Sequence, residues 1–170
     1  MIKSLFNLNL INLTKNFSMQ FDETDKKLLL FLQQDCKQTT KELSYKLGLS
    51  ITAVYERIRK LENNGVISKY VAILDKTKID KNFIILCHVK LTQHKKEYVL
   101  RFEKEVMTLD EVTECFHVSG DYDYILKICV KDMEDYRNFM LTKLTTIQHI
   151  ASTQSSFTIS EVKNTTELVL

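Results

Sequence analysis

The sequence contains no proline and only three glycines among its 170 residues. Proline interrupts helices and strands, and glycine adopts the left-handed conformation that ends many helices, so a chain poor in both has few signals that stop regular structure. The three glycines, Gly48, Gly65 and Gly120, therefore mark the positions where we expect turns between elements.

Cysteine pairs are also lacking. The four cysteines stand at positions 36, 87, 115 and 129, and no two form a Cys-x-x-Cys motif. Scattered cysteines are typical of a reducing compartment, so we expect a cytoplasmic protein without a disulfide framework. Cys115 and His117 share one face of a predicted strand, but two ligands do not complete a zinc site, and we expect no metal.

The motifs of the common enzyme classes are absent. The sequence has no nucleophile elbow, P-loop, dinucleotide fingerprint or pair of catalytic carboxylates in context. We therefore expect neither an enzyme nor a cofactor.

Residues 1–18 begin with a basic and apolar run that superficially resembles a signal peptide. Asparagines interrupt the run, no cleavage site follows, and the segment is too short and polar to span a bilayer. We interpret residues 1–18 as a disordered extension, with the native chain starting at Met19, and we expect no membrane association.

Residues 36–70 have the pattern of a helix-turn-helix. Thr39 and Glu42 have the spacing of a capping box, and Gly48 follows the last apolar residue of the short helix that this box begins. Ser50 is a good N-cap for a second helix. The bases of residues 36–70 exceed the acids by seven to three, whereas residues 76–170 hold 13 bases and 14 acids. A local basic excess indicates a DNA-binding element.

The second helix has two faces. Val54, Ile58 and Leu61 recur on the inner face, and the opposite face is polar and basic, as in a helix that enters the DNA major groove. Val66–Ile73 has the composition of a strand and would form a wing. The residues that we expect to contact DNA are Thr40, Ser50, Thr52, Tyr55, Arg57, Arg59, Lys60 and Lys69. A helical hairpin that only packs is the alternative.

Asp22 is a good N-cap for a first helix, so residues 19–74 are predicted to form a three-helix winged helix-turn-helix domain. Residues 75–82 are charged and lack apolar periodicity, and we interpret them as a hinge. Residues 83–163 alternate between the two periods, which predicts a ferredoxin-like β-α-β-β-α-β domain and an α+β protein. Residues 164–170 would be a C-terminal tail. The predicted strands cover 83–91, 112–119, 122–130 and 155–162, and the helices cover 95–107 and the segment that Asp132 caps.

In this arrangement both helices cover one face of the sheet, and we expect Leu, Ile, Val, Phe and Tyr side chains on the other. An apolar patch of that size predicts a homodimer formed through the open face.

Three segments, 47–50 (LGLS), 57–67 (RIRKLENNGVI) and 118–124 (VSGDYDY), resemble the Lrp/AsnC family of transcriptional regulators in order and spacing. The resemblance covers residues 20–163. It implies a regulator of double-stranded DNA that binds a small effector, typically an amino acid, and whose dimers assemble into tetramers or octamers. One departure is Glu56, which precedes Arg57 where the family often has two bases.

The turn at Gly120, Asp121, Tyr122 and Asp123 is the candidate effector loop, because a carboxylate can bind the ammonium group of an amino acid and the turn can offer backbone amides. The resemblance adds Phe116, Asp123, Met133, Ser156, Phe157 and Thr158 as effector positions. The alternative is a hairpin without a ligand.

Two further functions stay open. Sirohaem decarboxylases of haem biosynthesis resemble the same two-part architecture, although an enzyme would not need a DNA-reading face. A partner-binding module with a vestigial helix-turn-helix is the third interpretation.

Overall fold

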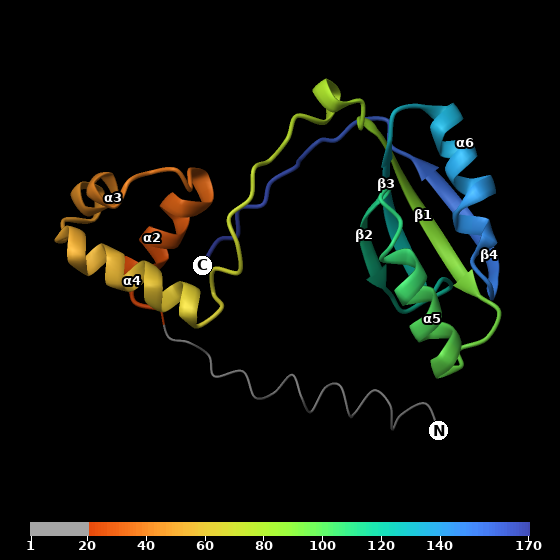
Figure 1. Cartoon of the computed structure of the whole chain (residues 1–170), viewed down its shortest axis with the longest axis horizontal. Helices are drawn as coiled ribbons and strands as arrows, with labels where there is room; N and C mark the ends of the chain where they lie inside the picture. The colour runs from red at the N-terminus through yellow and green to blue at the C-terminus, as the bar shows by residue number, and fades with distance from the viewer. Residues whose placement is uncertain (1–20) are drawn as a thin grey trace. The chain divides into compact units, whose positions relative to one another are not determined.

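The computed structural model describes residues 21–170, which form two compact units (Figure 1). The first unit contains residues 21–71 and 165–170, and the second is Ala72–Asn164. The predicted extension over residues 1–18 and the proposed start at Met19 lie outside the described residues. No helix in residues 21–170 is long and apolar enough to cross a membrane.

Three helices form the first unit: α2 (Glu23–Gln34), α3 (Thr40–Leu47) and α4 (Ile51–Asn63). The predicted caps are confirmed. Asp22 caps α2, Ser50 caps α4, and the Thr39 hydroxyl accepts from Glu42 N at 3.2 Å while Glu42 Oε2 accepts from Thr39 N at 2.6 Å. The apolar faces of the three helices meet in one core, made of Leu28, Leu29, Leu43, Val54 and Leu61.

Gly48 has φ 65° and ends α3 in the left-handed conformation, as its place after the last apolar residue predicts. Gly65 has φ 70° and follows α4. The backbone amides of Val66 and Ile67 then both donate to Leu61 O, at 2.9 and 3.2 Å. The expected strand over Val66–Ile73 is absent, because these amides complete the end of α4 and the segment has no strand partner among residues 21–170.

The C-terminal residues belong to the first unit because they bind α2. Gln33 Nε2 donates to Leu168 O at 3.0 Å, and Leu168 N donates to Gln33 Oε1 at 2.7 Å. Gln34 Nε2 adds a longer contact of 3.4 Å to Glu167 Oε1. The Gln33 amide thus satisfies both backbone groups of one tail residue, as a neighbouring strand would.

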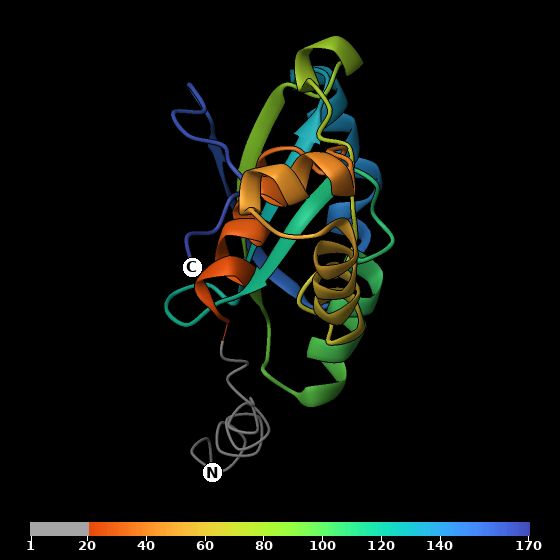
Figure 2. The ribbon, with the colours of Figure 1, turned by 90° about the vertical axis from the view of Figure 1, so that its left-hand side faces the viewer.

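The second unit is the predicted ferredoxin-like fold. Its elements are η1 (Lys76–Ile79), β1 (Phe83–Leu91), α5 (Lys96–Val106), β2 (Val112–His117), β3 (Tyr124–Val130), α6 (Met133–Thr142), η2 (Leu144–Thr146) and β4 (Ile150–Phe157). All neighbouring strands are antiparallel, in the order β2-β3-β1-β4. Helices α5 and α6 lie on the same side of the sheet (Figure 2). Phe102 and Phe139 pack there against inward residues such as Ile85 and Leu126.

The last strand begins earlier than predicted. The expectation was a strand over 155–162, but β4 is Ile150–Phe157. Ser152, Thr153 and Gln154 are polar and carry no alternating apolar pattern, so the residues immediately before Ser155 give no strand signal. The pairing with the central strand β1, from Ile85↔Phe157 to Leu91↔Ile150, sets its bounds.

The open face of the sheet is mixed and not apolar, which corrects the expectation. Leu86 and Phe116 are 40% and 52% exposed. Lys127 and Glu114 lie opposite each other and form an ion pair of 2.7 Å, so charge stands beside the apolar side chains. On the same face, Leu86 pairs with Ser156 and Phe116 pairs with Ile125. His88 lies between Ile125 and Gln154.

Candidate DNA-binding surface and effector loop

Helix α4 presents the predicted reading face. Thr52, Tyr55, Arg59 and Lys60 are exposed, while Val54 and Leu61 are buried on the opposite side. The Arg59 guanidinium lies 5.8 Å from the centre of the Tyr55 ring, a cation–π contact that holds both side chains on the outer surface. These four residues can donate hydrogen bonds to phosphates and base edges.

Arg57 has a different environment from its neighbours. Its Nη1 lies 2.7 Å from Asp22 Oδ2 and 2.6 Å from Asp25 Oδ1. Among the residues that the structure describes, Asp25 is the only charged side chain that is buried. The hydrogen bonds that the guanidinium donates to these two carboxylates raise the pKa of Arg57. The structure therefore ties Arg57, an expected DNA contact, to the first helix.

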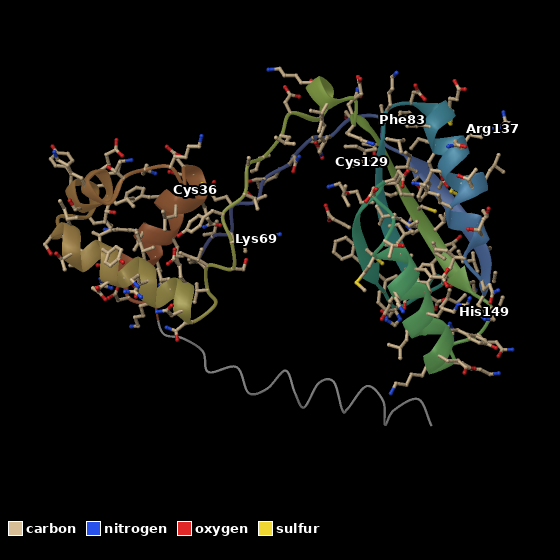
Figure 3. All side chains as sticks on the ribbon, in the orientation of Figure 1. Cys36, Lys69, Phe83, Cys129, Arg137 and His149 are labelled. Carbon is tan, nitrogen blue, oxygen red and sulfur yellow. The ribbon has the colours of Figure 1, made fainter. Side chains whose placement is uncertain are left out.

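The remaining expected contacts differ in accessibility. The Ser50 hydroxyl accepts from Ala53 N at 3.1 Å and so serves the helix cap, and Thr40 is half-buried at the start of α3. Lys69 is exposed on the extended segment after α4 (Figure 3). None of these three is excluded from DNA, but only Lys69 offers a free cation.

Sequence reasoning missed Tyr45, which is 91% exposed on α3. Leu43 is buried and Leu47 is half-buried on the inner face, and Tyr45 lies two residues, or about 200°, from each of them. An aromatic residue opposite an apolar pair is the signal that could have added Tyr45 to the candidate surface. It can contact a sugar, a thymine methyl group or a phosphate.

The candidate effector loop is held to the sheet by its aspartate. Asp123 Oδ2 accepts from Leu91 N at 2.7 Å, and Oδ1 lies 2.7 Å from His94 Nε2. The side chain is only 14% exposed. Gly120 has φ 132°, a conformation that other residues rarely adopt, and Tyr122 OH donates to Gln154. Both carboxylate oxygens of Asp123 thus have partners from the chain itself.

A single chain does not bring the nine candidate effector residues together. Thr158 N donates to Ile84 O at 3.1 Å, and Met133 opens α6 directly after β3, so both lie at the end of the sheet that Phe83 marks in Figure 3. The loop at 120–123 lies at the other end, near Leu91. The two ends are roughly 26 Å apart, because the nine residues of β1 make eight steps of about 3.3 Å.

The width of the sheet separates the candidates further. Phe116 is on the edge strand β2, and Ser156 and Phe157 are on the opposite edge strand β4. Phe157 turns to the helical side, where its ring lies 5.5 Å from that of Tyr136. A site that uses all nine residues would therefore need more than one chain.

Comparison with known proteins gives two family matches, one over the N-terminal part of the chain and one over the C-terminal part. Residues 21–68 match the model described as winged helix-turn-helix DNA-binding, and residues 84–168 match the Lrp/AsnC ligand binding domain. The leucine-responsive regulatory protein of Haemophilus influenzae is 36% identical over 156 residues, which cover 92% of this chain and 94% of that protein. The Bkd operon transcriptional regulator of Pseudomonas aeruginosa is 33% identical over 143 residues, or 84% and 94% of the two chains.

Solved structures agree. A crystal structure of an AsnC family transcriptional regulator from Agrobacterium tumefaciens superimposes with a TM-score of 0.84 at 35% identity, over 87% of this chain and 96% of that one. A transcriptional regulator from Neisseria meningitidis, crystallised as a complex with L-methionine, gives a TM-score of 0.84 at 31% identity, over 88% and 96%. The chain belongs to the Lrp/AsnC family of DNA-binding transcriptional regulators.

Proposed function

We propose that this protein binds specific sequences of double-stranded DNA in the cytoplasm and that a small effector, an amino acid, alters this binding. The observation that carries the DNA part is the outer face of α4, where Thr52, Tyr55, Arg59 and Lys60 are exposed together. A helix with such a face that follows a short capped helix, as α4 follows α3, is the arrangement with which helix-turn-helix proteins enter the major groove. Residues 19–74 would be the DNA-binding domain and residues 83–163 the effector domain.

The contact set follows from accessibility. Arg59 and Tyr55 would contact base edges, because they lie at the centre of the exposed face of α4, and Lys60 and Lys69 would contact phosphates. Thr40, Ser50 and Thr52 would add hydrogen bonds to the backbone. Arg57 would position α4 and would not itself contact DNA.

The effector part rests on the family match of residues 84–168 and on the loop at 120–123. An ammonium group that reaches Asp123 would replace His94 as the partner of Oδ1, and the Tyr122 ring would lie beside it. The separation of the other candidates, Phe116 and Met133 among them, supports a site that is completed by a second chain. We propose a homodimer, with tetramers or octamers built from it.

Nothing in the structure of residues 21–170 favours the sirohaem decarboxylase or the partner-binding module. The named relatives reported above are transcriptional regulators, and the outer face of α4 carries the exposed bases Arg59 and Lys60. We therefore propose that the protein is not an enzyme.

Genomic footprinting of the full-length protein, with and without each of the twenty amino acids, tests the proposal. We expect protected sites that share a motif and at least one amino acid that changes their occupancy. A protein that protects no site and binds random DNA without salt dependence would contradict the DNA part. Protected sites that no amino acid alters would contradict only the effector part.

A further inference from the structure

The first side chain of α4 is aliphatic and exposed. Ile51 directly follows the N-cap Ser50, and 51% of its surface is exposed. The other isoleucine of this helix, Ile58, packs against the core of the first unit, whereas Ile51 is not part of that core within residues 21–71. The fold of the described residues therefore leaves Ile51 in contact with water.

A single exposed isoleucine is common on protein surfaces, but Ile51 stands in line with two of the proposed DNA contacts. Ile51, Tyr55 and Arg59 follow one another at intervals of four residues, so their side chains form one stripe along α4. Tyr55 and Arg59 are exposed as well. The stripe thus begins with an aliphatic group, continues with an aromatic ring and ends with a cation.

The first turn of α4, residues 51–54, carries no charged side chain. In helices that enter the major groove of DNA, the N-terminal residues contact the edges of the bases. An isoleucine side chain has neither a donor nor an acceptor. Against the polar edge of guanine, adenine or cytosine it would displace water and leave donors and acceptors without partners.

We propose that Ile51 contacts the 5-methyl group of a thymine and so selects a T·A pair in the DNA sites of this protein. The inference rests on the proposed binding of α4 in the major groove and adds the feature of a base that its first turn recognises. The 5-methyl group of thymine is the apolar group that base pairs present in this groove. A contact between it and Ile51 removes apolar surface of both partners from water.

Ile51 and Arg59 contact different base pairs in this arrangement. The eight residues between them correspond to about 12 Å along the helix axis. Successive base pairs of DNA are only about 3.4 Å apart. Replacement of Arg59 should therefore leave the contact between Ile51 and thymine in place, which provides a control on the same helix.

Selection of binding sites by the full-length protein from a pool of random duplexes tests the proposal, when each thymine of the selected motif is then replaced by deoxyuridine. Deoxyuridine lacks the 5-methyl group and keeps the hydrogen-bonding atoms of thymine. We expect one such replacement to weaken binding about fourfold, the effect of one buried methyl group. A motif in which every thymine can be replaced without loss would overturn the inference and leave the proposed DNA binding intact. A pool that yields no motif would overturn both.

Variants assign the effect to one side chain. Ile51→Ala should bind the thymine and deoxyuridine duplexes equally, and Ile51→Val, which keeps a branched apolar side chain, should retain part of the difference. Ile51→Ala should also fold like the wild type, because Ile51 is exposed and alanine favours helices. Arg59→Ala should bind more weakly but keep the fourfold difference. A deoxyuridine effect that persists in Ile51→Ala would refute the contact, because it would arise from a change in the DNA itself.

Discussion

Arg57 Nη1 lies 2.6 Å from Asp25 Oδ1, and this contact buries the carboxylate of Asp25 between the first and third helices. Helix α4 is thus fixed to α2 by a charge pair whose members are 32 residues apart. A buried carboxylate without its partner is costly, since burial in a medium of low dielectric constant disfavours the charged form.

Replacement of Arg57 by alanine should therefore destabilise the domain. We expect a loss of about 3 kcal/mol in the free energy of unfolding, the lower end for a broken buried pair, because Arg57 itself is partly exposed. Urea unfolding of Arg57→Ala and Arg59→Ala provides the measurement and the control, since Arg59→Ala should cost less than about 0.5 kcal/mol. Equal stability with weaker DNA binding by Arg57→Ala would restore Arg57 as a DNA contact.

The same network predicts a pH dependence. The backbone hydrogen bond from Asp25 and the Arg57 guanidinium lower the pKa of Asp22 below its ordinary value of 3.8. The stabilisation is therefore complete above pH 3.8 and is lost as the pH falls through the lower pKa of the folded state. Between pH 5 and pH 3 the melting temperature should fall more for wild type than for Asp22→Asn, which keeps the cap but cannot titrate. Parallel curves would show that Asp22 contributes nothing.

A binding assay should distinguish the residues of α4 that contact bases from those that contact phosphates. We expect Lys60→Ala to weaken binding to all sequences and to reduce the salt slope by about one, because one phosphate contact is lost. Arg59→Ala should relax the preference at one or two base pairs by about 1–3 kcal/mol each. Fluorescence anisotropy across a salt series measures both, and Lys104→Ala on α5 is the charge-matched control. If both variants behave like Lys104→Ala, α4 does not read DNA.

His94 offers a direct test of the role of Asp123. If Asp123 Oδ1 binds the ammonium group of the effector, His94 competes for the same oxygen at 2.7 Å. His94→Ala should then raise the affinity for the effector several-fold, as measured by calorimetry with the amino acid that footprinting identifies. Thermal unfolding should show only a small change, because Leu91 N still binds Oδ2. Unchanged or weaker effector binding would indicate that Asp123 only anchors the hairpin.

Local signals in the sequence were sufficient for much of this fold. The box at Thr39 and Glu42 and the caps at Asp22 and Ser50 act within three residues, so their effect can be predicted without the fold. Both ends of β1, Phe83 and Leu91, were predicted correctly because its strand-forming residues follow one another without interruption. The order of helices and strands along residues 83–163 followed from the alternation of helical and extended periods.

Long-range partners could not be predicted in the same way. Arg57 looked like its neighbours because its partners, Asp22 and Asp25, belong to another helix. The first half of β4 has no apolar pattern, and only its pairing with β1 makes it a strand. The strand predicted over 122–130 begins only at Tyr124, so Asp123 lies in the connection before it, and its bonds to Leu91 and His94 depend on how this connection meets β1.

The bond between Gln33 and Leu168 makes the second unit a domain inserted into the first, since residues on both sides of it belong to the same unit. Two stretches of chain therefore join the units, one at residues 71–72 and the other at residues 164–165. Cleavage of the stretch near residue 71 alone would leave residues 165–170 bound to α2 through Gln33. Residues 165–170 therefore hold the two fragments of such a cleaved chain together, because they are covalently joined to the second unit and bound to the first.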